Sequence, residues 1–272
     1  MEKYFGKIID VHTHVYPERI ALKATQNIGE FYEIPMNEVG LFENLAEIMK
    51  KTGICKTFIL STAVVPKQVR AINDYLIEFF IKKGLTDTFT LFGTVHPDME
   101  NPCDEIDYCV KNGIKGLKFH SDFLKIAVDD PRMDCIYDLA QDLQIPIMFH
   151  AGDCRYNYTN PSQFVKISKK YPRLIGIAAH LGGYSQWDEV LESGLLDTNF
   201  WYDTSSSMFC INPDIMRKIF EKSCSEKIMF GSDFPMWNAS NELNNLAKYQ
   251  FSDTILEKVL YKNALEFLKI ID

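Results

Sequence analysis

The sequence has no long hydrophobic run and no pairing pattern among its cysteines. No apolar stretch approaches the roughly 20 residues that span a bilayer, and the first residues lack the continuous apolar core of a signal peptide. The seven Cys among 272 residues are scattered without CxxC spacing, which argues against a disulfide framework or a Cys-ligated zinc site. We therefore expect reduced thiols, a cytoplasmic location and no membrane partner.

The chain also has little positive charge. Its 29 Lys and Arg against 37 Asp and Glu give a formal net charge of −8. Such an acidic chain is a poor partner for nucleic acid or for an anionic membrane surface, so neither is expected. Hydrophobic residues make up 46% of the sequence, which excludes a disordered chain and is typical of a globular one.

Linkers, low-complexity tracts and blocks of like charge are missing, so we expect a single domain over residues 1–272. Short β-branched and aromatic segments alternate with longer amphipathic ones. The expected strands are residues 7–14, 55–62, 88–96, 115–121, 145–152, 174–182, 199–205 and 227–233. Eight such units in about 250 residues predict an α/β fold of the (β/α)8 TIM barrel type. An open doubly wound sheet is the alternative, but the GxGxxG turn common in that fold is absent.

Helices are expected where apolar residues recur every three or four positions, over residues 41–51, 69–82, 133–143, 161–170 and 215–222. Asn160 and Asn212, each followed by a proline, are the expected N-caps of two of them. Gly53 and Gly113 are expected to follow helix ends in a left-handed conformation. The tail over residues 252–271 is expected to be helical and to cover one end of the domain.

Only six His are present, and each lies where an expected strand ends. They are His12 and His14 in the first strand, His96 in the third, His120 in the fourth, His150 in the fifth and His180 in the sixth, while Asp233 ends the eighth. The carboxyl ends of barrel strands open onto one face, where the active sites of such enzymes lie. A single His there is more often packed against the backbone than a ligand. Six on one face are better explained by a metal site.

These residues make the sequence similar to the amidohydrolase superfamily of metal-dependent barrels, and within it to amidohydrolase family 2. The matching motifs are DVHTH at 10–14, GLKFH at 116–120, PIMFHAG at 146–152, AAHLGG at 178–183 and FGSDFP at 230–235. The resemblance implies that His12, His14, His150 and Asp233 bind a divalent metal, with zinc favoured and manganese or iron as alternatives. It also implies that the metal activates a water and that Asp233 is the general base. A helix cap is the structural alternative for Asp233.

Three more residues have roles that the resemblance leaves open. His180 is expected either to act catalytically or to bind a second metal, and its structural alternative is to orient a ligand. Lys118 and His120 share one face of the fourth strand. Lys118 either bridges two metals as a carboxylated lysine or faces a substrate carboxylate as a cation. His120 is expected to contact the substrate, as in the similar strand of urease. One metal is favoured over two.

Other polar groups follow the same strand ends, namely Asp153, Tyr156, Asp203, Ser205 and Trp237. Arg155 is expected to bind a substrate carboxylate bidentately, with an exposed loop cation as the alternative. Cys154 and Cys210 have no adjacent base, so a nucleophilic role is unsupported. The segment over residues 16–37 is long for a βα loop and contains Phe31 and Tyr32. It is either a substrate lid or a surface excursion.

The leading hypothesis is a metal-dependent hydrolase that uses a metal-activated water on an amide, lactone or related C–N or C–O bond of a small molecule. Lys118 and Arg155 favour a substrate that carries a carboxylate. A non-oxidative decarboxylase of a cyclic or aromatic carboxylic acid is the closest alternative, because it uses the same scaffold.

Three other classes are less favoured. A phosphoesterase with the DxHxH motif usually needs three metals and more acidic ligands, and a TatD-like nuclease is expected to have Glu where Lys118 stands. A barrel used only for binding is expected to lack part of the metal-ligand set, whereas every required residue type is present. The substrate and any homo-oligomer stay open.

Overall fold

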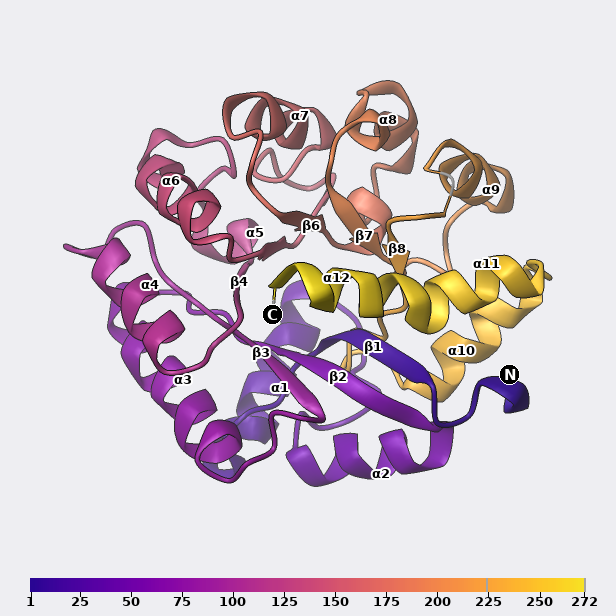
Figure 1. The fold of residues 1–272 in the computed structure, drawn as a ribbon, viewed down its shortest axis with the longest axis horizontal. Helices are drawn as coiled ribbons and strands as arrows, with labels where there is room; N and C mark the ends of the chain where they lie inside the picture. The colour runs from indigo at the N-terminus through magenta and orange to yellow at the C-terminus, as the bar shows by residue number, and fades with distance from the viewer. Residues whose placement is uncertain (224, 272) are drawn as a thin grey trace.

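Eight parallel strands form a ring with helices around it in the computed structural model, which describes residues 1–223 and 225–271 (Figure 1). The strands are β1 (Ile8–Thr13), β2 (Ile54–Leu60), β3 (Phe89–Gly93), β4 (Gly116–Phe119), β5 (Ile147–Phe149), β6 (Gly176–Ala178), β7 (Trp201–Asp203) and β8 (Ile228–Met229). They pair in sequence order, and the ring closes where the Val11 amide donates to the Phe230 carbonyl at 2.9 Å. The predicted (β/α)8 TIM barrel is confirmed, and the open sheet is excluded.

The helices follow the strands around the outside of the ring. They are α1 (Glu18–Tyr32), α2 (Phe42–Thr52), α3 (Val69–Leu76), α4 (Pro102–Lys111), α5 (Ser121–Leu124), α6 (Asp134–Leu143), α7 (Pro161–Lys170), α8 (Trp187–Glu192), α9 (Pro213–Lys222), α10 (Ala239–Lys248), α11 (Asp253–Glu257) and α12 (Asn263–Ile271). A π-helical segment over Ile77–Ile81 continues α3, and another over Lys258–Lys262 joins α11 to α12. None of the described helices has the length and apolar character that a membrane crossing requires.

The expected helices are all present, with ends within two residues of the predicted ones. Their caps work as the sequence indicates. The Asn212 side chain accepts from the amides of Asp214 and Ile215 at the start of α9. Gly53 ends α2 with φ +74°, a left-handed conformation that a glycine adopts without strain.

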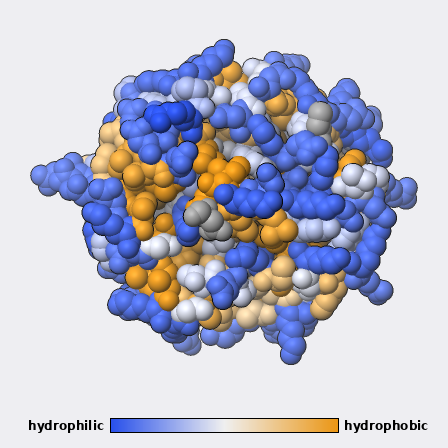
Figure 2. All heavy atoms as spheres, viewed as in Figure 1, coloured by the Kyte–Doolittle hydropathy of each residue, from blue (hydrophilic) through white to orange (hydrophobic). Residues whose placement is uncertain are grey.

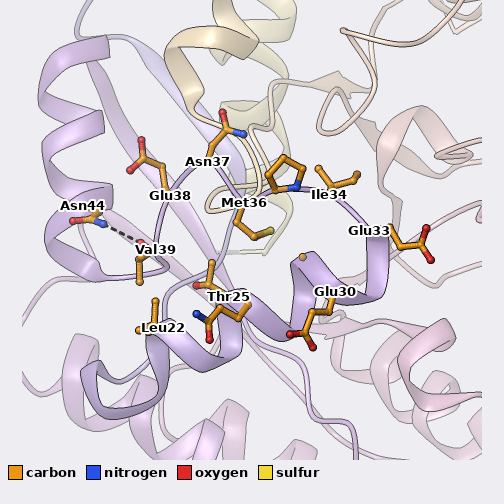
Figure 3. A pocket seen from close by; sticks show the side chains of 13 residues that line it. Leu22, Thr25, Glu30, Glu33, Ile34, Met36, Asn37, Glu38, Val39 and Asn44 are labelled. Carbon is orange, nitrogen blue, oxygen red and sulfur yellow. Dashed lines mark hydrogen bonds between the residues drawn. The ribbon is translucent and has the colours of Figure 1, made fainter.

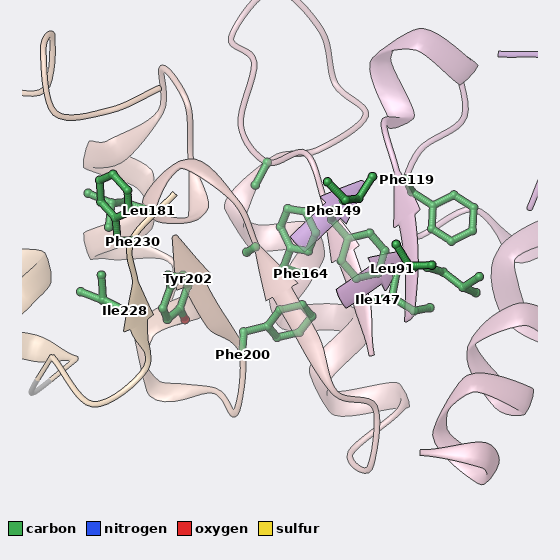
Figure 4. Close-up of a cluster of buried hydrophobic side chains, with 14 of the residues drawn as sticks. Leu91, Phe119, Ile147, Phe149, Phe164, Leu181, Phe200, Tyr202, Ile228 and Phe230 are labelled. Atoms are coloured by element: carbon green, nitrogen blue, oxygen red, sulfur yellow. The ribbon is translucent and has the colours of Figure 1, made fainter. Parts of the chain in front are cut away.

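The core has two layers, one on each side of the strands. Alternation along β5 sends Ile147 and Phe149 outward, where they pack with Phe164 of α7 (Figure 4). Met148 points the other way, into a second cluster that Phe58 of β2 and residues of several other strands fill from inside the ring. The barrel interior is therefore solid at this level, and the polar groups gather farther along the strands.

The C-terminal helix α12 closes one end of the barrel. Phe267 of α12 lies 6.1 Å from the Phe58 ring and 5.3 Å from the Trp201 ring. Trp201 is the first residue of β7, so α12 covers the amino ends of the strands, as the helix crossing the centre of Figure 1 shows. The same face is largely hydrophilic, with smaller apolar areas among the charged side chains (Figure 2). The predicted cover is present, and it leaves the opposite end to the histidines.

Candidate metal centre

The sequence-predicted site residues lie at or just beyond the carboxyl ends of the strands. His12 is in β1 and His14 follows it, His120 follows β4, His150 follows β5, His180 comes two residues after β6, and Asp233 comes four residues after β8. The strands themselves end earlier than predicted, because the chain leaves the ladder where these side chains turn toward one another. The site is therefore made by the last residues of some strands and by the loop residues that follow the others, on a rigid barrel.

His12 is held by a buried carboxylate. Its Nδ1 lies 2.8 Å from Asp203 Oδ2, so Nδ1 carries the proton and Nε2 keeps its lone pair. Burial and the charge of Lys118 lower the pKa of His12 to about 4, which keeps the ring neutral. Burial alone would raise the pKa of Asp203, but His12 beside it shifts that pKa below its ordinary value. A neutral imidazole whose other nitrogen donates to a carboxylate is the usual form of a metal-binding His.

His14 is oriented in the same way by the backbone. Its Nδ1 lies 2.8 Å from the Leu60 carbonyl, which can only accept, so Nε2 is again the free nitrogen. The Nε2 atoms of His12 and His14 lie 3.3 and 3.5 Å from Asp233 Oδ1. All three ligand atoms fall within 4.8 Å of one another. This donor set, two neutral imidazoles and one carboxylate, fits a divalent transition metal.

Asp233 is itself positioned by two neighbours. Ser206 Oγ donates to Asp233 Oδ2, and Trp237 Nε1 donates to Ser206 Oγ at 2.9 Å. Burial would raise the pKa of Asp233, but His12 and His14 hold it well below its ordinary value, so the carboxyl is ionised. One oxygen is thus fixed by Ser206 while the other faces the two imidazoles. Ser206 has no sequence signal of its own, because SSS at 205–207 matches no motif.

His150 is directed away from this group. The Nδ1 of His180 donates to the Ser205 carbonyl at 3.0 Å, so His180 Nε2 accepts from His150 Nδ1, also at 3.0 Å. The remaining His150 Nε2 lies 3.5 Å from Asp122 Oδ2 and forms a second group with Asp122 and Asp153. The structure therefore brings together three of the four expected ligands, and His150 is not among them.

Asp122 was missed by the sequence reasoning. Asp122 lies two residues after His120, in the segment FHSDF. An acidic residue this close to a strand-end His is the sequence signal that points to it. Burial, and after it the charge of Asp153, raise the pKa of Asp122 to about 7. A carboxyl that holds its proton there can donate to His150 Nε2, which has no hydrogen-bond partner among the described residues.

Lys118 lies inside the barrel, next to the metal-ligand group. Its neighbours Leu117 and Phe119 pack in the outer layer, so alternation directs Lys118 inward. The side chain is 1% exposed, and Nζ lies 3.2 Å from His12 Nε2. Burial lowers the pKa of Lys118 to about 8. The amine is thus placed both to bridge metals after carboxylation and to face a substrate, and both roles stay predictions.

Arg155 is already engaged by the protein. Its guanidinium makes a bidentate pair with Asp153, with NH2 2.7 Å from Oδ2, and NH1 donates to the Phe31 carbonyl at 2.9 Å. It also lies 4.9 and 5.2 Å from the ring centroids of Phe31 and Tyr32. Arg155 therefore fastens the end of α1 to the barrel. The expectation that it binds a substrate carboxylate stays a prediction.

The segment over residues 16–37 contains the helix α1, whose last turn lies over the site. Tyr32 at its end places its hydroxyl 2.6 Å from His120 Nε2. His120 in turn stacks on Phe123 at 3.6 Å and on His150 at 4.1 Å between ring centroids. The contact supports the lid interpretation of this segment over the surface excursion.

A cavity lies along α1. It measures about 810 Å³ and is lined by α1 residues such as Leu22 and Glu30, by the segment from Glu33 to Val39 and by Asn44 (Figure 3). None of the predicted site residues lines it. Tyr32 instead contacts His120 and lies near His150, so we place the chemistry at the histidines and not at this cavity.

Two of the remaining residues have ordinary structural explanations. His96 Nδ1 accepts from the Asp98 amide at 3.1 Å, which is the backbone role that a single strand-end His was expected to have. Cys154 is an exposed thiol that no general base contacts among the described residues.

Comparison with known proteins assigns the chain to a family. A family model described as Amidohydrolase matches residues 9–270, so the chain belongs to the amidohydrolase family and the resemblance drawn from the motifs is confirmed. No curated protein matches the chain. Membership supports an enzyme, and it leaves the reaction open.

Solved structures share the fold at low sequence identity. An uncharacterised TIM-barrel protein from Bordetella bronchiseptica has a TM-score of 0.78 at 17% identity, over 97% of this chain and 99% of that one. A 2,6-dihydroxybenzoate decarboxylase from Rhizobium has a TM-score of 0.74 at 15% identity, over 97% and 99%. A dihydroxybenzoic acid decarboxylase from Polaromonas sp. JS666, with bound manganese and the inhibitor 2-nitroresorcinol, has a TM-score of 0.74 at 16% identity, over 97% of each chain. At these identities the likeness shows the fold alone.

Proposed function

We propose that the protein is a metal-dependent hydrolase of small molecules in which His12, His14 and Asp233 hold a divalent ion. The observation that carries this proposal is the convergence of His12 Nε2, His14 Nε2 and Asp233 Oδ1 within 4.8 Å. Both imidazoles have their protons committed elsewhere, to Asp203 and to the Leu60 carbonyl, so both present lone pairs to the same point. Three such donors leave room for water or substrate on the ion.

The ion is proposed to be zinc, with manganese as the alternative. Two imidazoles and a carboxylate suit either, and the Polaromonas decarboxylase that shares this fold holds manganese. His150 is left out of the proposed three-residue set because its nitrogens face His180 and Asp122. A second ion bridged by a carboxylated Lys118 is the two-metal alternative.

The chain's own residues supply proton transfer and orientation. A divalent ion at this site would lower the pKa of a bound water toward about 7 and polarise a substrate carbonyl. Asp233, ionised and steadied by Ser206, accepts a proton from the attacking water and passes it to the leaving group. Asp203 fixes the His12 ring, and Lys118, whose Nζ lies beside His12, and His120 are proposed to contact the substrate.

Decarboxylation of an aromatic acid is the second candidate, because aromatic rings wall the site. Phe31 and Phe123 stand 4.7 Å apart at 86°, and Tyr184 lies 5.7 Å from Tyr32. Such walls suit a flat ring. The decarboxylases from Rhizobium and Polaromonas act on dihydroxybenzoic acids on this same fold.

A substrate panel on stripped and reloaded protein tests both candidates. We expect the protein reloaded with zinc or manganese to turn over lactones or amides in ¹⁸O water with one ¹⁸O incorporated per product. Release of CO2 from hydroxylated aromatic acids without ¹⁸O incorporation would favour the decarboxylase instead. Asp233→Asn should abolish either activity, whereas Asp142→Asn on the exposed face of α6 should not. Full turnover by metal-free protein, or by Asp233→Asn, would contradict metal-dependent catalysis.

A further inference from the structure

Tyr32 reaches the site from outside the barrel strands that carry the family motifs. It is the last residue of α1, and its hydroxyl lies 2.6 Å from His120 Nε2, although 88 positions separate the two residues in sequence. The Tyr32 ring also lies 6.1 Å from the His150 ring. Arg155 donates a hydrogen bond to the Phe31 carbonyl at this end of α1, and this bond helps to hold Tyr32 against His120.

The direction of the hydrogen bond between them follows from the groups involved. The His120 ring is 8% exposed and lies stacked between the Phe123 and His150 rings, so a neutral imidazole meets the phenol of Tyr32. The Tyr32 hydroxyl has no other hydrogen-bond partner among residues 1–223 and 225–271. If it accepted from His120 Nε2, both its own proton and the Nδ1 lone pair of His120 would lack a partner among the described residues, whereas donation leaves only the Nδ1 proton unpaired. It therefore donates, and Nε2 is the unprotonated nitrogen.

This leaves the proton of His120 on Nδ1. Nδ1 is buried and has no hydrogen-bond partner among the described residues. The ring cannot turn freely to find one, because it is stacked between Phe123 at an interplanar angle of 6° and His150 at 11°. A buried N–H without an acceptor has lost its hydrogen bond to water and gained none in return, which is unfavourable. An oxygen atom of a bound substrate would remove that cost.

We propose that Tyr32 is a positioning residue that locks His120 in the Nδ1–H tautomer, so that His120 donates a hydrogen bond to an anionic or carbonyl oxygen of the substrate. The role of His120 toward a substrate rests on the proposed function, whereas the tautomer does not. A fixed donor of this kind stabilises negative charge that develops on oxygen, without any reorganisation at the moment of reaction. In this way α1 sets which nitrogen of His120 can donate, in addition to covering the site.

The tautomer can be measured directly in the zinc-loaded protein. Long-range ¹H–¹⁵N spectra of ¹⁵N-histidine-labelled protein distinguish protonated from unprotonated ring nitrogens, and His120→Gln identifies the His120 signals among the six histidines. We expect His120 to be protonated at Nδ1 in the wild type and to shift largely to Nε2–H in Tyr32→Phe, which keeps the ring and removes the donor. Tyr156→Phe, in the same aromatic group but without a bond to His120, should leave the wild-type pattern.

The outcomes decide the proposal without any need for turnover. A wild-type His120 protonated at Nε2 would overturn it before any variant is made, and so would a Tyr32→Phe spectrum identical to the wild type. The other five histidines report whether each variant is folded. With a substrate in hand, Tyr32→Phe should lower kcat about 10- to 100-fold with little change in KM, since complete loss of one such donor costs about 10²–10³-fold. If the tautomer is as proposed but no substrate is hydrolysed, only the proposed function fails.

Discussion

Lys118 is a buried amine whose surroundings disfavour its protonated form. No carboxylate of residues 1–223 or 225–271 lies within hydrogen-bonding distance of it, and its Nζ contacts His12 Nε2 at 3.2 Å. Burial depresses its pKa from 10.5 to about 8, so the protonated form is disfavoured in the folded protein. Between these two pH values the unfolded chain binds more protons than the folded one, and the stability of the fold rises with pH.

Lys118→Met should therefore stabilise the metal-free protein. We expect the free energy of unfolding at pH 7 to increase by ~1–3 kcal/mol, because a buried cation is replaced by an apolar chain of similar length. The gain should fade as the pH rises through 8 and vanish above about 10.5. Urea unfolding at pH 7 and pH 10.5 measures it, with Lys111→Met at the exposed end of α4 as the control. A loss of stability at pH 7 would instead indicate that a carboxylated or paired Lys118 is the native form.

Ser206 acts on the proposed metal through Asp233. Ser206→Ala removes the donor to Asp233 Oδ2, and loss of such a hydrogen bond to a metal-binding carboxylate typically weakens metal affinity about 10- to 100-fold. Competition with a chromogenic chelator measures the zinc affinity. Ser207→Ala is the matched control, because Ser207 Oγ donates to the Ser205 carbonyl and not to Asp233. Equal affinities of the two variants would argue against Asp233 as a ligand.

At the scale of elements, α1 and α12 close the two ends of the barrel in different ways. At the amino ends of the strands, α12 inserts Phe267 and Leu268 into the apolar interior cluster. At the carboxyl ends, α1 meets polar groups, and its attachment there depends on the Arg155 contact with the Phe31 carbonyl. One end is closed by hydrophobic packing, and the other is held by hydrogen bonds together with aromatic contacts such as that between Phe31 and Phe123.

Phe267→Ala tests the apolar seal. Removing a fully buried ring that contacts Phe58 and Trp201 should destabilise the protein by about 3–5 kcal/mol. Chemical denaturation measures the loss. The exposed Leu265→Ala on the same helix is the control and should cost far less. A similar cost for both variants would mean that α12 does not depend on this contact.

The attachment of α1 is tested by removing the ion pair behind it. The double variant Asp153→Asn, Arg155→Met deletes the donor to the Phe31 carbonyl without leaving a buried carboxylate unpaired. Hydrogen exchange of peptides covering residues 28–36 should accelerate about tenfold, since a hydrogen bond from a charged donor contributes roughly 1.5–3 kcal/mol. The pair Asp130→Asn, Arg132→Met, on an exposed loop, should leave α1 unchanged. Unaltered exchange in α1 would show that other contacts hold the lid.

For the whole molecule, the proposed metal binding would be coupled to folding. An ion that binds only the native state at 100 times its Kd adds about 2.7 kcal/mol, which raises the Tm of a chain of this size by roughly 5–10 °C. Zinc added to stripped protein should produce such a shift, and scanning calorimetry measures it. His14→Ala should bind weakly and shift little, whereas His96→Ala should respond like the wild type. A full shift in His14→Ala would place the ion elsewhere.

The fold could be predicted from the sequence almost completely. Eight apolar segments separated by amphipathic ones specify a (β/α)8 barrel because each parallel strand must bury both faces and each connection must supply a helix to cover it. Local signals such as Asn212 before Pro213 and Gly53 after α2 mark helix ends through short-range hydrogen bonds and backbone freedom, which need no tertiary context. The sequence also placed all six His on one face of the barrel, because the expected strand ends follow from local patterns along the chain.

What the sequence could not determine is the direction in which each functional group points. His150 follows its strand as expected, yet its Nδ1 donates to His180 and its Nε2 lies 3.5 Å from Asp122, and both neighbours come from other segments of the chain. Arg155 is held by Asp153 and by the α1 carbonyl, and Tyr32 meets His120 across 88 positions of sequence. Which ring nitrogen carries the proton depends on a hydrogen-bond partner from another part of the chain, and the two groups meet only when the barrel is folded. Composition and periodicity thus determined the barrel and the face that carries the site, and the tertiary structure decided which three residues meet at one point.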